Sequence, residues 1–229
     1  GRLSLEYDLD KANRLSSELA FHRMEMKADR DEETLSTDPA LGLLRDAETE
    51  MTMGMVAAKA SWRRQFATEH ELVAEAEHSL FGMESEIDGR FDPTAAPLRF
   101  ERIGNDNDRA ESGFKLDYKR PLGEKSSLNV GYEVDLERHD YDLSGAFGDS
   151  PATLVPVAAL TNRFAYDELI NAVYATATFP VGKLEVQPGL RFEQADLTID
   201  QKTDDLRVEA EYFRVYPTLH LGYELSKAD

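Results

Sequence analysis

Long stretches of this chain alternate between apolar and polar residues with a period of two. One clear stretch runs from 128 to 137 and another from 184 to 193. A period of two is that of a β-strand, in which successive side chains point to opposite faces. These stretches exceed the ~5–6 residues of an ordinary strand in a soluble sheet. We therefore expect an all-β fold, an antiparallel up-and-down meander of about nine long strands.

Weaker alternation marks the remaining expected strands. They lie at 3–9, 15–26, 51–66, 71–83, 114–118, 169–179 and 213–225. Asn171 interrupts an otherwise apolar face within one of them. The stretch 71–83 also contains many Ala and Glu residues, which favour helices, so a helix is an alternative there.

The connections between these strands alternate in length. Short ones are expected at 10–13, 67–70, 122–126 and 180–183, and longer ones at 27–50, 84–108 and 144–162, before a moderate one at 200–206. The first long connection could contain a helical turn near Pro39 to Arg45. In an up-and-down sheet all short turns then lie on one side. Short turns on one side and long loops on the other are typical of an outer-membrane β-barrel, so we expect a segment of a transmembrane barrel in the cell outer membrane.

Composition excludes several functions. The 229 residues carry a formal net charge of −19, which would repel the phosphates of nucleic acid. The chain has no cysteine, which removes disulfides and thiolate chemistry. No apolar run approaches the roughly 18 residues of a transmembrane helix, but a membrane strand needs only ~9–11 residues.

Alternation also assigns faces to the expected barrel wall. The residues expected to face lipid are Leu128, Val130, Tyr132, Val134, Leu136, Leu184, Val186, Leu190, Leu219 and Leu221. Those expected to face the lumen are Glu133, Asp135, Glu137, Arg191, Glu193 and His220, with Glu209 and Glu211. Aromatic residues near the short turns suit a bilayer interface, although aromatics also favour strands in general. These are Tyr7, Trp62, Phe66, Tyr118, Phe179 and Tyr223.

Three segments carry a family resemblance. They read LDYKRPLGEKSSLNVGYE at 116–133, NRFAYDELINAVYATATFPVGKLEVQPGLRFE at 162–193 and YFRVYPTLHLGYELS at 212–226. Together they resemble the barrel wall of TonB-dependent outer-membrane receptors, in the subgroup of the outer-membrane protein β-barrel family. The resemblance is good over 110–226 and weaker over 1–100. These are scaffold motifs, so they identify the architecture better than the cargo.

The resemblance implies energised uptake of a scarce nutrient, of the metal-chelate or saccharide class. Its implied partners are outer-membrane lipid, a plug domain, the remaining barrel strands and, through an N-terminal region, TonB. We expect residues 1–229 to form a partial β-barrel without a plug domain or TonB box, not closed by this chain alone. An isolated piece could self-associate through its open strand edges. The alternative is a soluble antiparallel β-module that binds a partner or lipid through its apolar face.

Chemistry-bearing residues are sparse. None of the five histidines has a partner at convincing ligand spacing, and no Ser-His-Asp arrangement is indicated. We expect no enzyme activity and no cofactor, and we interpret His220 as a lumen histidine rather than a metal ligand. Asp106, Asp108 and Glu111 offer the hard oxygen donors that calcium uses, but Asx-rich turns are common, so this is a weak metal candidate.

Overall fold

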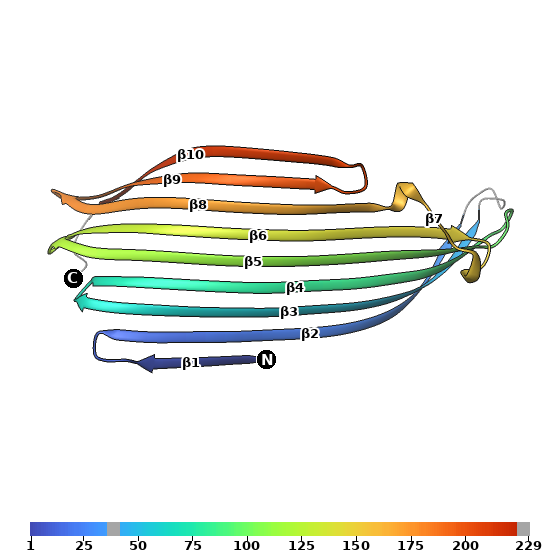
Figure 1. The fold of residues 1–229 in the computed structure, drawn as a ribbon, viewed down its shortest axis with the longest axis horizontal. Helices are drawn as coiled ribbons and strands as arrows, with labels where there is room; N and C mark the ends of the chain where they lie inside the picture. Colours follow the sequence, from blue (N-terminus) through green and yellow to red (C-terminus); the bar gives the residue numbers. More distant parts are fainter. Residues whose placement is uncertain (36–41, 224–229) are drawn as a thin grey trace.

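The computed structural model describes residues 1–35 and 42–223 and consists of one antiparallel sheet (Figure 1). Two short 3-10 turns, η2 (Pro151–Thr153) and η3 (Ala158–Leu160), lie in one connection. The strands are β1 (Arg2–Asp8), β2 (Asn13–Thr34), β3 (Leu43–Ala67), β4 (His70–Pro93), β5 (Arg99–Gly123), β6 (Ser126–Gly148), β7 (Val155–Pro156), β8 (Asn162–Val181), β9 (Leu184–Gln201) and β10 (Leu206–Tyr223).

Each long strand pairs with its neighbours in sequence. The order is β1-β2-β3-β4-β5-β6-β8-β9-β10, and the two-residue β7 pairs with β6. Within the described residues no pairing joins β1 to β10, so this sheet is open. The expected antiparallel meander of about nine long strands is confirmed.

The turns and loops lie at opposite ends of the sheet (Figure 1). The short turns occupy 9–12, 68–69, 124–125 and 182–183, and the connections at 94–98, 149–161 and 202–205 lie at the far end. Gly182 sits in one two-residue turn with φ of +66°, a left-handed conformation that glycine adopts without steric strain. The expected separation of turns and loops is confirmed.

Two of the expected long loops are wrong, because strands continue through them. β2 runs on to Thr34 and β3 starts at Leu43, while β4 runs on to Pro93 and β5 starts at Arg99. Both faces of these extensions carry polar residues, so no apolar periodicity marks them. Cross-strand ion pairs such as Arg102 Nε to Asp88 Oδ1 at 2.7 Å join them instead. Residues 39–41 of the expected helical turn lie outside the described residues, and Leu43 to Arg45 are strand.

The other two expectations about local structure have different outcomes. The helix alternative for 71–83 is wrong, since this stretch lies inside β4 and pairs with strands on both sides. Pairing along the whole segment outweighs the helix preference of Ala and Glu. The loop expected at 144–162 is correct for 149–161 only, because β6 extends to Gly148.

The described sheet has almost no core of its own. Its buried apolar residues are four alanines, Ala47, Ala165, Ala172 and Ala195, and Glu101 is its buried charged residue. Large side chains such as Leu219 remain 62% exposed. A sheet with two uncovered faces must therefore be covered by something beyond these strands.

No helix among the described residues is long and apolar enough to cross a membrane.

Candidate functional site

The register gathers the predicted lipid-facing residues on one face, which we call the apolar face. Directly paired residues in neighbouring strands point to the same face. Val134 pairs with Phe114 of β5 and Asn171 of β8, and Val186 of β9 pairs with Leu221 of β10. The alternation within each strand and these pairings extend the face to all ten predicted positions. Whether lipid covers this face is not tested by the pairing and stays a prediction.

The six predicted interface aromatics also belong to the apolar face, near the short turns. Tyr7 connects through Leu15 to Trp62, and Phe179 connects through Val186 and Leu184 to Tyr223 along β9. Phe66 lies beside the bulge of β3, with its ring centroid 6.4 Å from that of Tyr118. Their role at a bilayer interface stays a prediction.

Asn171, the polar interruption of the apolar face, has a partner there. The hydroxyl of Tyr132 donates a hydrogen bond of 3.0 Å to its side-chain oxygen. An unpaired amide on an apolar surface would be unfavourable. The interruption is therefore accommodated by a cross-strand pair.

Towards the loops, the apolar face becomes charged. On β6 the series Leu128 to Leu136 is followed on the same face by Arg138, Asp140 and Asp142. Lys202, whose ammonium donates to Asp140 at 3.0 Å, lowers the pKa of that carboxyl below its usual range, with a further contribution from Arg138.

Two glutamates expected on the lumen face belong to this charged part instead. Glu209 and Glu211 pair with Thr198 and Asp196, and they alternate in phase with Phe213 of the apolar face. The expectation for these two residues is wrong. In β10 the apolar series ends at Phe213, and the charged series continues in the same phase.

The opposite face, which we call the polar face, carries an ion-paired network near the turns. Arg191 Nη1 donates to Glu133 Oε2 at 2.5 Å, and its Nε donates to Glu193 Oε2 at 3.1 Å. The three predicted lumen residues therefore meet across β6, β8 and β9. Charge-assisted hydrogen bonds of this kind hold the side chains in one geometry.

Tyr174 extends this network towards β5. Its hydroxyl donates to Asp117 Oδ1 at 2.5 Å, and the Arg191 guanidinium carbon lies 5.9 Å from the centre of its ring. Gly131 of β6 pairs directly with Tyr174, and a Cβ at that position would overlap the ring. Glycine here therefore makes room for an aromatic side chain lying across the sheet.

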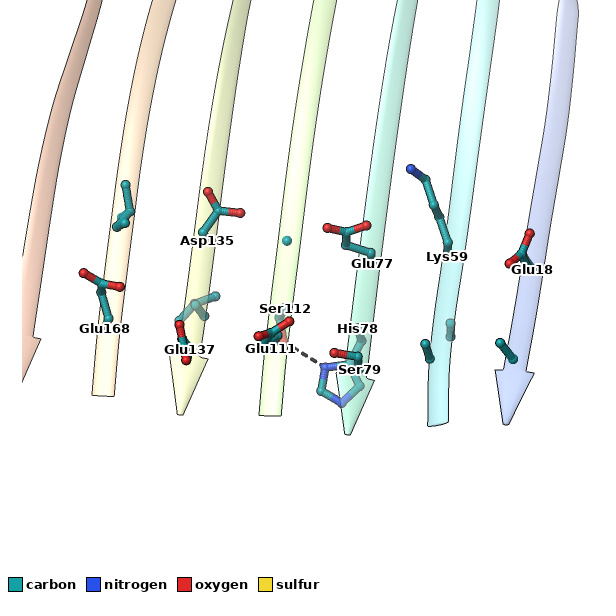
Figure 2. Close-up of a pocket in the computed structure, with 16 residues that line it drawn as sticks. Glu18, Lys59, Glu77, His78, Ser79, Glu111, Ser112, Asp135, Glu137 and Glu168 are labelled. Carbon is teal, nitrogen blue, oxygen red and sulfur yellow. Dashed lines mark hydrogen bonds between the residues drawn. The ribbon is translucent and has the colours of Figure 1, made fainter. Parts of the chain in front are cut away.

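A hollow of about 540 Å³ lies next to this network on the polar face (Figure 2). Figure 2 shows its acidic side chains spread over adjacent strands, with Lys59 among them. Arg109 forms ion pairs with Glu111 and with Glu137, the latter at 3.0 Å. The carboxylates lining the hollow are Glu18, Glu77, Glu111, Asp135, Glu137 and Glu168. Such a surface attracts cations and cationic groups.

Of the weak metal candidates, Glu111 lines this hollow and Asp106 and Asp108 do not. His220 pairs with Gln187 and lies on the polar face near the turns, away from the hollow. The run from Asn105 to Asp108 is part of β5 rather than a loop, which corrects its expected location. Glu111 points to the face opposite Asp106 and Asp108, so the three carboxylates do not converge. Among the described residues no group of three His, Cys, Asp or Glu could hold a metal ion.

Two histidines of the strands, His78 and His139, have neutral hydrogen-bond partners. His78 Nδ1 lies 2.8 Å from the hydroxyl of Ser112, and His139 Nε2 lies 2.5 Å from the Asn107 side-chain oxygen. Within the described residues His78 has no hydrogen bond to a carboxylate. This Ser-His pair therefore lacks the third member of a hydrolase triad.

Sequence reasoning missed two groups of residues on the polar face, the first of them at the loop end. Arg45 donates to the buried Glu101 at 2.5 Å and to Glu32 at 3.1 Å, and its guanidinium lies 5.4 Å from the Phe91 ring. Hydrogen bonding to Glu101 raises the pKa of Arg45. No single-strand pattern signals this group, since its members come from four strands.

The second missed group is the chain's methionines. They stand two residues apart within each of two strands, at 24 and 26 and at 51, 53 and 55, with one more at 83. This spacing predicts a shared face in each strand, so it was a signal that the sequence contained.

The chain is similar to known proteins both in sequence and in fold. A family model described as the outer membrane protein beta-barrel family matches residues 64–229. Among solved structures, the chain is similar to BauA, the ferric preacinetobactin receptor from Acinetobacter baumannii, with 10% identity and a TM-score of 0.50 over 98% of this chain and 42% of that one. It is similar to FpvA of P. aeruginosa, solved with bound pyoverdine and iron, with 12% identity and a TM-score of 0.49 over 99% of this chain and 38% of that one.

The chain thus spans about two fifths of the length of these solved receptors. No curated protein matches it. The family match covers most of the chain, and the long antiparallel strands agree with it, which confirms the family suggested by the sequence motifs. The chain belongs to the outer membrane protein beta-barrel family and is a protein of the cell outer membrane.

Proposed function

We propose that residues 1–229 form part of the wall of a TonB-dependent receptor that takes up a scarce nutrient across the outer membrane. The apolar face contacts lipid, and the polar face lines a lumen that a plug domain fills. Membership of an outer-membrane family removes the alternative of a soluble β-module.

The observation that carries this proposal is one row of directly paired residues whose character changes across the sheet. It is apolar in β2 to β5 and polar or charged in β6 to β10. The row is Phe21, Val56, Leu80, Ala110, Arg138, Asp167, Thr198 and Glu209. The boundary of the apolar band therefore crosses the strands obliquely. Strands of a transmembrane barrel are tilted by ≈ 35–45°, so a bilayer surface crosses them in this way.

The strand lengths support the same proposal. A spanning strand needs ~9–11 residues, whereas β3 and β5 have 25 residues each. On β6 the apolar series spans Leu128 to Leu136, which matches the membrane requirement. The remaining residues of these strands extend beyond the bilayer into water.

The polar face provides the partner surface. The acidic hollow and the Arg191 network lie behind the lipid-facing band, where a lumen would be, and their charged groups would contact a plug domain or water. BauA, which shares the fold, is a receptor for ferric preacinetobactin, so a chelated metal is the first ligand class to test. TonB would act through a plug rather than through these strands. We assign no enzyme activity to the wall.

Transport tests the receptor part of the proposal. The full-length protein containing this chain would be expressed in cells that lack their own receptors, and growth would be measured on ferric chelates and on saccharides, with and without TonB. We expect at least one ligand to support growth only when TonB is present. Uptake that persists without TonB would contradict the proposal.

Labelling tests the wall itself, because the chain has no natural cysteine. Consecutive residues of β6 provide a matched pair, Asn129→Cys on the polar face and Val130→Cys on the apolar face. In lipid vesicles, a water-soluble maleimide should label the first variant and spare the second, and both should react after unfolding. Equal labelling of the two folded variants would contradict lipid contact.

A further inference from the structure

All six methionines of the chain lie on the polar face of three adjacent strands. The sequence contains no others. Met53 of β3 pairs directly with Met24 of β2 on one side and with Met83 of β4 on the other. Met26 pairs with Met51 in the next row. We call this group the methionine cluster; its sixth member, Met55, pairs with His22 in the row nearer the turns.

The spacing of these strands brings thioether groups together. Directly opposite residues of an antiparallel pair have Cβ atoms ≈ 4.5–5.5 Å apart. Methionine is unbranched and has three rotatable side-chain bonds, so neighbouring sulfur atoms can turn towards a common point. Met24, Met53 and Met83 form one continuous row, and Met53 is central. Three sulfur ligands can therefore approach one ion above Met53.

The distribution of residue types argues against a purely apolar role. On the opposite face of the same strands, the two rows that flank Met24, Met53 and Met83 are Arg23, Gly54 and Gly82, and Glu25, Thr52 and Glu84; the nearest apolar row, Phe21, Val56 and Leu80, contains no methionine. Leucine would supply a similar apolar area on the polar face. Methionine differs from it chiefly in its polarisable sulfur. Every methionine therefore lies on the polar face, whereas Phe, Val and Leu supply the apolar side chains of the opposite face.

The cluster is also open to incoming ions. Met24, Met26 and Met55 are 37%, 41% and 42% exposed. The cluster lies on the loop side of the acidic hollow, whose row begins with Ala20 and Ala57. The acidic lining raises the local concentration of cations. An ion arriving from the loop end would meet the thioethers first.

We propose that the methionine cluster binds a soft monovalent metal ion, Cu(I), through the thioethers of Met24, Met53 and Met83. Thioether sulfur is a soft ligand that selects Cu(I) over hard cations such as calcium and magnesium. Met26, Met51 and Met55, with His22, stand within one row of this set and supply alternative ligands. The proposal is independent of transport, because binding requires only the shared face and the pairing of these strands.

The test uses the full-length protein in detergent under reducing, oxygen-free conditions. Cu(I) is offered as its coloured bicinchoninate complex, and the loss of colour measures transfer to the protein. The variant carries Met24→Leu, Met53→Leu and Met83→Leu, which conserve apolar volume and remove sulfur. Its matched control carries Phe81→Leu, Ile87→Leu and Ile103→Leu, which change apolar residues of the same face without touching sulfur.

We expect the natural protein and the control to withdraw Cu(I) and the sulfur-free variant to do so far less well. Loss of one outer-shell partner already lowers metal affinity by about 10–100-fold, so loss of three ligands should exceed that. Failure of the natural protein to compete, or equal competition by the sulfur-free variant, would overturn the proposal. The second result would assign the cluster a purely apolar role.

Far-UV circular dichroism checks that each variant folds. If the sulfur-free variant does not fold, X-ray absorption at the copper edge of the loaded natural protein decides the question. Sulfur neighbours support the proposal, and a shell of nitrogen and oxygen alone overturns it. None of these measurements involves TonB, so a failure here is distinguishable from failure of the receptor assignment.

Discussion

The half of the sheet next to the short turns and the half next to the loops carry opposite chemistry on the same two faces. Near the turns, one face bears Val134 and its apolar neighbours, and the other bears Glu133 and its ion pairs. Near the loops, the first face bears charged residues such as Asp140, and the second bears the methionine cluster. β6 passes through both halves without interruption.

The contrast between the two halves helps to specify the register in which each strand pairs with its neighbours. Side chains alternate with a period of two, so a slip of one residue exchanges the faces along the entire strand. In the turn half a slip would move Glu133 and Asp135 into the apolar band. In the loop half it would move Asp140 and Asp142 onto the face that carries Tyr141. The turn half and the loop half of β6 therefore both disfavour a one-residue shift of its register.

The largest predicted effect is an arginine in the apolar band. Val134→Arg should lower the free energy of unfolding from lipid by about 2–4 kcal/mol, because the charge would lie near the bilayer midplane. Ser144→Arg, on the same face of the same strand but in the loop half, should change it by about 0–1 kcal/mol. Urea unfolding from vesicles measures both. Equal losses would show that the two halves share one environment.

The next effect concerns the buried ion pair of the loop half. Glu101→Ala should cost about 1–3 kcal/mol, because Arg45 loses its strongest hydrogen-bond partner in a largely buried site. Glu133→Ala, in the turn half, should cost less, since both partners there are about 28–29% exposed and Arg191 keeps Glu193. A larger loss for Glu133→Ala would reverse the ranking of the two networks.

The turn half could be predicted from the sequence and much of the loop half could not. A strand between lipid and a polar lumen alternates clearly, so the run from Leu128 to Leu136 is visible in one strand alone. In the segments 27–34 and 84–93 both faces carry polar residues, so no clear period of two marks them as strand. Their pairing depends on ion pairs between strands, such as Arg102 with Asp88, which one strand's pattern does not contain.

The same reasoning explains the outcome for the candidate site. Glu133, Arg191 and Glu193 were predicted to share a face, and they hydrogen-bond there. The acidic hollow needs Glu18 of β2 and Glu168 of β8 in adjacent rows of the polar face, and this depends on the register of five successive strand pairs. The period of each strand gives the face of a residue, but the turns and bulges set its height.

A smaller effect tests how the apolar band tolerates a polar group. Tyr132→Phe removes the hydrogen bond to Asn171, and the stability in lipid should fall by about 0.6 kcal/mol and by no more than about 1.7 kcal/mol. In the background of Asn171→Leu, the same change should have almost no effect. A double-mutant cycle of vesicle unfolding measures the coupling. Equal losses in both backgrounds would mean that the pair is not coupled.

The smallest effect belongs to the turn between β1 and β2. Asp10 accepts hydrogen bonds from the backbone amides of Ala12 at 2.7 Å and Asn13 at 2.9 Å, and these bonds, with the Asn13 side chain, lower its pKa from the ordinary 3.8. Its contribution to stability is therefore fully present above pH 3.8 and is lost as the pH falls through the lowered pKa. In Asp10→Asn, the urea midpoint of unfolding should fall slightly less steeply as the pH is lowered in the acid range. Glu124→Gln, in another short turn, is the control for removing a turn charge. An unchanged steepness in Asp10→Asn would mean that the carboxylate does not hold this turn, and that the tight end of the sheet depends on strand pairing alone.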